Sequence, residues 1–121
     1  PEYGDINSGY NYVDPILELG AHVAPTGIAF YNGEMFPEKY KNNIFITLHG
    51  SWNRASKVGY KVLRVILDDA GDVIDTKDFI TGWLDGEKVI GRPSAPLVKR
   101  DGSLLISDDK ANVIYHITYI Q

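Results

Sequence analysis

Short apolar or alternating runs recur through the chain, and turn residues separate them. Helical periodicity is nearly absent, because the only helical candidate is the single turn 37–40 (PEKY), which begins at a proline. The sequence therefore predicts an all-β chain. Its expected strands lie near residues 15–19, 26–31, 43–48, 60–67, 73–80, 94–99, 103–107 and 112–119.

These strands repeat in a fixed order. Four of them fill residues 26–80, and the three within 94–119 match the first three of that set. Four antiparallel strands are the unit of a β-propeller blade. The chain is therefore expected to be a partial propeller of about two antiparallel four-stranded blades. Residues 1–20 would end a preceding blade, 21–84 would form one full blade, and 85–121 would form a last blade lacking its fourth strand. A β-sandwich is the alternative.

Composition argues against several function classes. The net charge of -4 does not favour a general nucleic-acid or acidic-membrane surface. The chain has no cysteine, so it has neither a disulfide nor a thiolate metal site. No apolar run approaches the roughly 18 residues of a membrane span; no signal peptide is visible within the chain, and its first residue is Pro1, not Met. No histidine pair has zinc-site spacing.

The loops at one end of the predicted blades carry most of the chemically versatile side chains. In an up-and-down blade, the loop before the first strand lies at the same end as the loop between the second and third strands. Segments 20–26, 49–59, 88–94 and 107–111 should therefore share one end. Their polar and aromatic residues are His22, His49, Trp52, Asn53, Arg54, Arg92, Asp108 and Asp109. This asymmetry predicts a polar site with aromatic walls.

Each cationic or aromatic candidate has two interpretations. Arg92, held extended before Pro93, could bind a carboxylate through two N–H groups or form a surface salt bridge. Arg54 could bind a ligand or remain a solvated loop cation. Trp52 could stack on a flat ligand or cover the end of the core. The imidazole of His49 could act as a base or as a hydrogen-bond partner, or it could be structural.

The remaining candidates favour structural roles. Asp108 and Asp109 follow a strand, where aspartate commonly caps a turn. Trp83 is expected to pack between blades, and His116 to be an ordinary strand residue. His22 is a weaker site candidate than His49.

Several long motifs together resemble one known family. The segments HVAPTGIAFY, FPEKYKNNIFITLHGSWNR, GYKVLRV, DFITGWL, GRPSAPLVKRDGSLLISDD and VIYHITY stand in this order between residues 14 and 119. They resemble the C-terminal part of the glucose/sorbosone dehydrogenases that use pyrroloquinoline quinone (PQQ), and the sorbosone dehydrogenase-like members share the long HGSWNR loop. The resemblance implies a six-bladed propeller, a sugar or aldose substrate, and a periplasmic or secreted enzyme.

The resemblance also implies roles for residues. His49, Trp52, Asn53, Arg54 and Arg92 would belong to the PQQ pocket. The family's catalytic base and most of its calcium ligands lie in earlier blades, which leaves the catalytic residue of this chain unknown, with His49 as a candidate. Glucose-oxidising members carry a second arginine where this chain has Ser94.

Two other outcomes stay open. The chain could be a non-catalytic propeller-like module that binds sugar or protein. The open sides of a two-blade unit also predict self-association, or further blades N-terminal to it. The segment 13–19 is a candidate for the missing fourth partner of strand 112–119.

Overall fold

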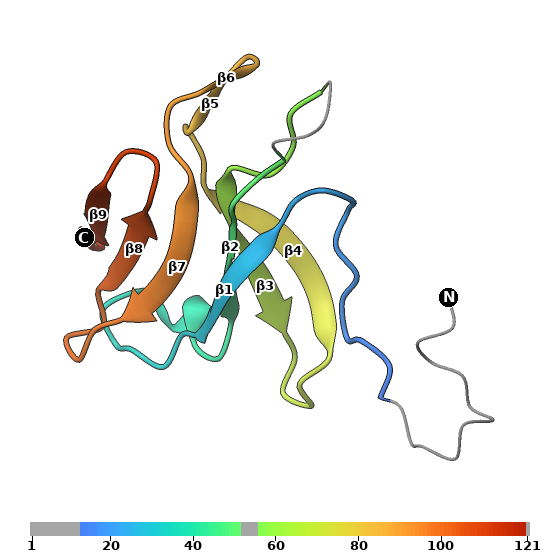
Figure 1. Cartoon of the computed structure of the whole chain (residues 1–121). Helices are drawn as coiled ribbons and strands as arrows, with labels where there is room; N and C mark the ends of the chain where they lie inside the picture. Colours follow the sequence, from blue (N-terminus) through green and yellow to red (C-terminus); the bar gives the residue numbers. More distant parts are fainter. Residues whose placement is uncertain (1–12, 52–55, 121) are drawn as a thin grey trace.

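The computed structural model describes residues 13–51 and 56–120 (Figure 1). Two antiparallel sheets dominate it. The first has the order β1-β2-β3-β4, and the second has the order β7-β8-β9. The strands of the first sheet are β1 (Pro25–Phe30), β2 (Ile44–Leu48), β3 (Lys61–Leu67) and β4 (Val73–Ile80). The strands of the second are β7 (Pro93–Val98), β8 (Leu104–Asp108) and β9 (Val113–Ile117).

This architecture confirms the predicted all-β, blade-like fold. The described residues contain no α-helix, and the predicted helical turn is the 3-10 helix Glu38–Tyr40. One small hairpin, β5 (Leu84–Asp85) and β6 (Lys88–Val89), joins the two sheets and was not predicted. No helix in the described part of the chain is long and apolar enough to cross a membrane.

Sequence pattern explains the position of each strand in the first sheet. β2 is apolar at four of its five positions and buried at all of them, as expected for a strand with neighbours on both sides. β4 (VIDTKDFI) carries charged residues and is largely exposed, which suits the outer edge of the sheet.

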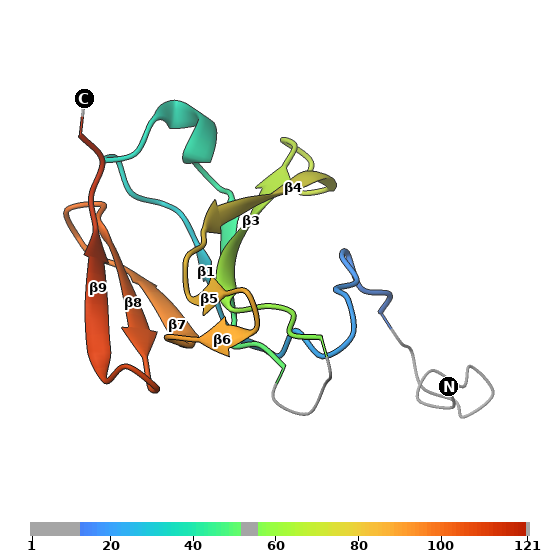
Figure 2. The ribbon, with the colours of Figure 1, turned by 90° about the horizontal axis from the view of Figure 1, so that it is seen from above.

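The two sheets pack against each other through an aromatic and aliphatic cluster. Its buried members are Tyr31, Phe36, Phe45, Tyr60, Val62, Trp83, Leu104 and Ile106. Seen from above, β7 lies next to β1 (Figure 2). The strands approach closely at Gly27, where an added Cβ would lie 2.6 Å from Pro96 Cδ and 2.9 Å from Ala95 Cα. The backbone carbonyl of Ser94 accepts hydrogen bonds from the hydroxyls of Thr26, at 2.6 Å, and Thr47, at 3.0 Å.

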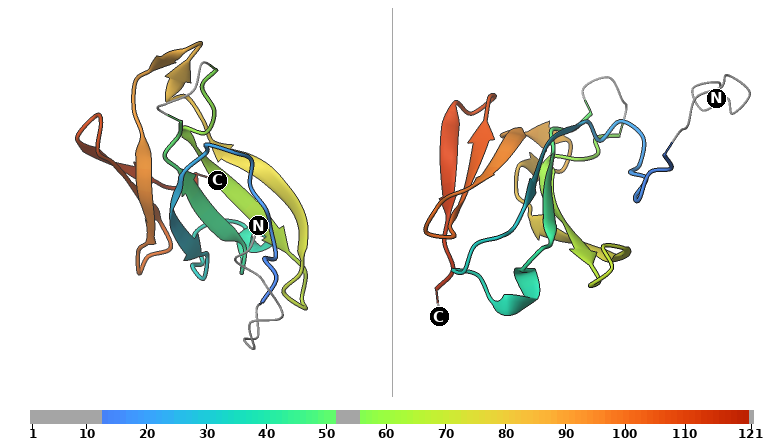
Figure 3. Two further views of the ribbon diagram at one scale, coloured as in Figure 1. Left: turned by 45° about the vertical axis from the view of Figure 1, so that its right-hand side comes forward. Right: turned by 90° about the horizontal axis from the view of Figure 1, so that it is seen from below.

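The segment before β1 corrects one prediction. Residues 15–19 do not form a strand, and they do not pair with β9 in this chain. Instead, Leu17 and Leu19 pack on a second apolar cluster on the face of the first sheet that points away from β7–β9 (Figure 3). The alternation of PILEL correctly marks which side chains are covered, although its backbone makes no sheet.

Both outer faces keep exposed apolar side chains. Ile28 and Phe30 on β1 are 65% and 59% exposed, and Leu97 on β7 and Ile114 on β9 are 59% and 68% exposed. Exposed apolar groups of this size on blade faces are typical of surfaces that another element covers.

Candidate functional site

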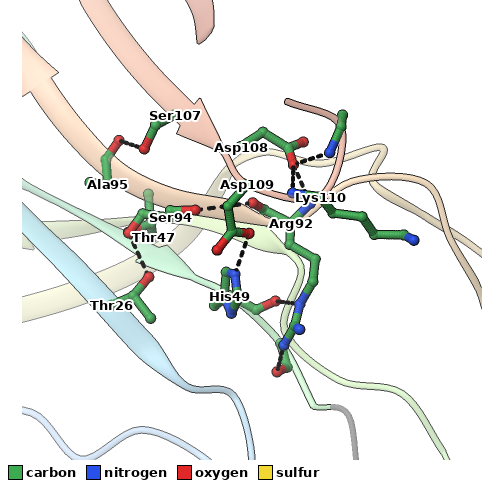
Figure 4. A network of polar contacts seen from close by, with 12 residues as sticks. Thr26, Thr47, His49, Arg92, Ser94, Ala95, Ser107, Asp108, Asp109 and Lys110 are labelled. Carbon is green, nitrogen blue, oxygen red and sulfur yellow. Dashed lines mark hydrogen bonds and ion pairs between the residues drawn. The ribbon is translucent and has the colours of Figure 1, made fainter. Parts of the chain in front are cut away.

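Segments from both sheets converge at one end of the molecule, at the top of Figure 1, and Figure 4 shows the polar network there. The backbone N–H groups of His49 and Gly50 donate to the carbonyls of Ala24 and Val23, both at 2.9 Å. These contacts tie the end of β2 to the segment before β1. Arg92, just before β7, reaches the same place from the second sheet. The described parts of the loops predicted to share one end therefore do so.

Arg92 joins the two sheets through backbone carbonyls. Its Nε donates to the carbonyl of His49 at 3.1 Å, and its Nη2 donates to the carbonyl of Gly50 at 2.9 Å. The guanidinium also lies 5.7 Å from the centre of the Tyr60 ring, within cation–π range. Of the two interpretations of Arg92, the surface salt bridge is not found among the described residues, where Arg92 binds main-chain oxygens; carboxylate binding stays a prediction.

Asp108 organises the turn that follows β8. Its side chain is buried, and Oδ1 accepts from the backbone N–H groups of Arg92, Lys110 and Ala111 at 3.0, 3.0 and 2.9 Å. Oδ2 accepts from the hydroxyl of Tyr115 at 2.8 Å. Burial raises the pKa of the Asp108 carboxyl, but these hydrogen bonds outweigh burial and hold the pKa below its ordinary value. The predicted turn-capping role is confirmed.

Asp109 does something different from the turn capping expected of it. Its Oδ1 lies 2.8 Å from His49 Nε2, across the boundary between the sheets. The His49 side chain is 18% exposed and that of Asp109 is 64% exposed. The hydrogen bond from His49 is the main reason that the pKa of the Asp109 carboxyl lies below its ordinary value. Sequence reasoning placed both residues at one end but did not pair them.

The position before Arg92 has room only for glycine. A Cβ at Gly91 would overlap the carboxylate of Asp108 and the indole of Trp83. Trp83 is buried between the sheets, and its ring meets that of Tyr115 edge-on at 5.5 Å, which confirms the predicted packing role. The glycine lets the chain pass close to this cluster before Arg92 turns toward β2.

The other predicted site residues have different outcomes. Trp52, Asn53 and Arg54 lie outside the described residues, so the expected placement of Arg54 in the same pocket as Arg92 stays a prediction. His22 is exposed, with a left-handed φ of 64°, and no contact joins this described residue to His49 or Arg92. His116 lies in β9, where Nε2 is 2.9 Å from the hydroxyl of Ser103, which agrees with a strand residue.

Two further features border the site. Glu87, in the β5–β6 turn, accepts from the backbone N–H of Lys57 at 2.9 Å and so holds this hairpin against the 49–59 loop. The Asp-Gly pair at 85–86 is a turn signal that could have predicted the hairpin. A surface depression also borders the site, and its lining residues are Ser94, Ser107, Asp108, Asp109, Asn112, Val113 and Ile114. Among residues 13–51 and 56–120, no group of three or more His, Cys, Asp or Glu side chains could hold a metal ion.

Comparison with known proteins places this arrangement in context. The model of the TrAA12-like family matches residues 3–119. An uncharacterized protein of Borreliella burgdorferi is 42% identical over 119 residues, which is 97% of this chain and 31% of that protein. A pyrroloquinoline quinone-dependent pyranose dehydrogenase of Coprinopsis cinerea is 39% identical over 64 residues, which is 53% of this chain and 8% of that protein.

Two solved structures share the fold of this chain. The holo form of the PQQ domain of the Coprinopsis cinerea pyranose dehydrogenase superposes with a TM-score of 0.70 at 25% identity, over 98% of this chain and 32% of that one. The calcium structure of a Trichoderma reesei carbohydrate-active enzyme of family AA12 gives a TM-score of 0.72 at 24% identity, over 94% of this chain and 29% of that one. The chain thus spans under a third of the length of these relatives.

Proposed function

The chain belongs to the TrAA12-like family, and from this premise we propose that it supplies two blades and one side of the quinone pocket of a PQQ-dependent sugar dehydrogenase. The resemblance to PQQ-dependent sugar dehydrogenases seen in the sequence is confirmed by the relatives. The observation that carries the proposal for the pocket is the convergence of His49 and Arg92, from different sheets, at one end.

The residues at this end have the donors that such a cofactor needs. PQQ is a flat quinone with three carboxylates, and guanidinium groups bind carboxylates well. Carbonyls take one N–H each from Nε and Nη2 of Arg92, so three of the five N–H groups of an arginine are not used by these two bonds. The two nearby carboxylates already have hydrogen-bond partners within the chain. Asp108 accepts from four donors, and Asp109 is bound to His49.

These contacts suggest separate roles for the cofactor and for the residues that would hold it. When bound, the quinone would supply the redox chemistry by taking hydride equivalents from a sugar C–OH group. Arg92 would hold a carboxylate, and His49 would hydrogen-bond to the cofactor. Trp52, Asn53 and Arg54 remain sequence-based candidates for the same pocket.

A titration of the ¹⁵N-labelled chain with PQQ tests the proposal. The backbone amide signals of Gly50, Arg92 and Asp109 should shift, and the affinity should be micromolar or weaker because only part of a pocket is present. A flat benzene tricarboxylate without a quinone controls for simple attraction of anions.

Two arginine variants sharpen this test. Arg92→Gln should weaken PQQ binding roughly tenfold or more, because a charge-assisted hydrogen bond contributes about 1.5–3 kcal/mol. Arg100→Gln is the matched control, since Arg100 is exposed in the turn between β7 and β8, at the opposite end. Equal losses in both variants, or PQQ-induced shifts around Arg100, would contradict the proposed pocket.

A second candidate function is an interaction module. The residues Ile28, Phe30, Leu97 and Ile114 favour it, because they stay largely exposed on the outer faces of the two sheets. These faces would pack on further blades or on another copy of the chain. Light scattering at increasing concentration should then show association, and a persistent monomer of 13.5 kDa would remove this candidate.

A further inference from the structure

We propose that Asp109 is a positioning residue: it binds Nε2 of His49 and thereby presents Nδ1 as the ring nitrogen available to a ligand at this end. The inference rests on the proposed function for its ligand, PQQ, but not for the orientation of the ring. The relevant contact is the 2.8 Å separation between His49 Nε2 and Asp109 Oδ1 (Figure 4).

The main chain of His49 is fixed before its side chain is considered. Its N–H donates to Ala24, and its carbonyl accepts from Nε of Arg92 at 3.1 Å. The last freedom left to the residue is therefore rotation of the side chain. Asp109 removes that freedom from the opposite sheet, since a carboxylate accepts from N–H and an imidazole cannot rotate without breaking the bond.

Asp109 is itself held in place. It follows Asp108, whose Oδ1 accepts from the N–H groups of Lys110 and Ala111 and so shapes the turn around Asp109. The carboxylate of Asp108 cannot substitute for that of Asp109, because its own oxygens bind Arg92, Tyr115 and this turn. The pair of aspartates thus divides two tasks, with Asp108 building the turn and Asp109 facing the histidine.

The bond fixes the chemical character of the two ring nitrogens. In the neutral ring, a carboxylate at Nε2 requires the proton there, which leaves Nδ1 as an acceptor. In the imidazolium form, Nδ1–H becomes a donor while Nε2–H stays on Asp109. No hydrogen bond from the described residues occupies Nδ1. A contact with an exposed carboxylate such as that of Asp109 contributes little to stability, which leaves orientation as its main effect.

Side-chain ¹⁵N spectra of the three histidines test the positioning role in the absence of any cofactor. In the neutral form of the ring, read at a pH above the transition seen in the same spectra, His49 should show a protonated Nε2 and an unprotonated Nδ1. In Asp109→Ala the two ¹⁵N signals should move toward each other as the tautomers mix, and Asp109→Asn, which keeps one acceptor oxygen, should fall between. His49→Gln assigns the signals.

Asp69→Ala is the matched control, because Asp69 is exposed in the β3–β4 turn, away from this end. It should leave the His49 signals unchanged. Backbone spectra of every variant check that the fold is kept, and Asp109→Asn serves as the test variant if Asp109→Ala does not fold. Unchanged His49 signals in a folded Asp109 variant, or a wild-type ring protonated only at Nδ1, would overturn the positioning role.

Adding PQQ separates this inference from the proposed function. In the wild type, PQQ should shift Nδ1 of His49 more than Nε2, and Asp109→Ala should reduce the affinity about fivefold, the equivalent of one ordinary hydrogen bond of about 1 kcal/mol. If the cofactor-free histidine spectra of the Asp109 variants are as expected and PQQ causes no shift, the proposed function fails and the positioning role stands. If PQQ moves Nε2 instead of Nδ1, the positioning fails while the cofactor site stands.

Discussion

Replacing Asp108 by alanine should destabilise the chain strongly. The carboxylate accepts four hydrogen bonds, and two of their donors, the N–H groups of Lys110 and Ala111, lie in an exposed turn where water can replace the acceptor. The other two, from Arg92 N–H and the Tyr115 hydroxyl, are partly buried at 3.0 and 2.8 Å. At about 1.5–3 kcal/mol for each bond to a charged acceptor, losing these two costs about 3–6 kcal/mol.

A cost of this size is a large fraction of the roughly 5–15 kcal/mol by which a typical domain is stable. Asp108→Asn keeps one acceptor oxygen and can still bond Tyr115 through its amide, so it should cost about 1–2 kcal/mol. Urea unfolding followed by circular dichroism measures both variants, with Asp69→Asn as a control for the loss of one exposed charge.

Acid titration provides a second measure of the same residue. The pKa of Asp108 is lowered in the folded chain, so its contribution to stability is full above the unfolded pKa of about 3.9 and is lost as pH falls through the folded value. The wild type should therefore lose stability below about pH 4 more steeply than Asp108→Asn. If Asp108→Ala costs less than about 0.5 kcal/mol, the hydrogen bonds assigned to it do not stabilise the fold.

Three further predictions concern single contacts. Gly27→Ala should lower the free energy of unfolding by about 2–3 kcal/mol, because the new Cβ would lie 2.6 Å from Pro96 Cδ and 2.9 Å from the Cα of Ala95 in a packed strand. Gly20→Ala is the control, since its Cβ would meet open space and should cost far less in the same urea assay. Tyr31→Phe should cost about 1–3 kcal/mol, because its hydroxyl donates to the carbonyl of Gly102 at 2.7 Å and accepts from the N–H of Phe36 at 2.9 Å, and both groups would lose a buried partner. His49→Ala should raise the pKa of the Asp109 carboxyl toward its ordinary value, measured by its ¹³C shift against pH; an unchanged pKa would show that the His49 bond does not lower it.

The sequence predicted the strands well because strands follow from local patterns. It also predicted which loops share one end, because that follows from the up-and-down order of the strands. Seven of the eight expected strands exist, and β4 begins and ends where its alternation and its flanking turns predicted. The failure at 15–19 has a physical reason. Alternation reports which side chains are covered, and Leu17 and Leu19 are covered by packing on a sheet face without any strand partner.

The site was predictable as a place but not as a set of contacts. Turn chemistry sufficed for Asp108, whose bonds to Lys110 and Ala111 are local. The pairing of His49 with Asp109 joins residues 60 positions apart, and it depends on how far one blade is rotated against the next. The same holds for Arg92, for which the sequence suggested a carboxylate partner and the structure provides carbonyls.

The aromatic cluster between the sheets has a consequence for how the chain unfolds. Leu104 and Ile106 of β8 are fully buried, and they belong to the same cluster as Phe45 of β2 and Val62 of β3. If either sheet melted, the other would expose most of its inner face to water, so we expect a single cooperative transition and amide exchange rates on β2 and β8 that converge toward one opening reaction. A pair of blades, not a single one, is therefore the smallest unit of this architecture that can bury a hydrophobic core away from water.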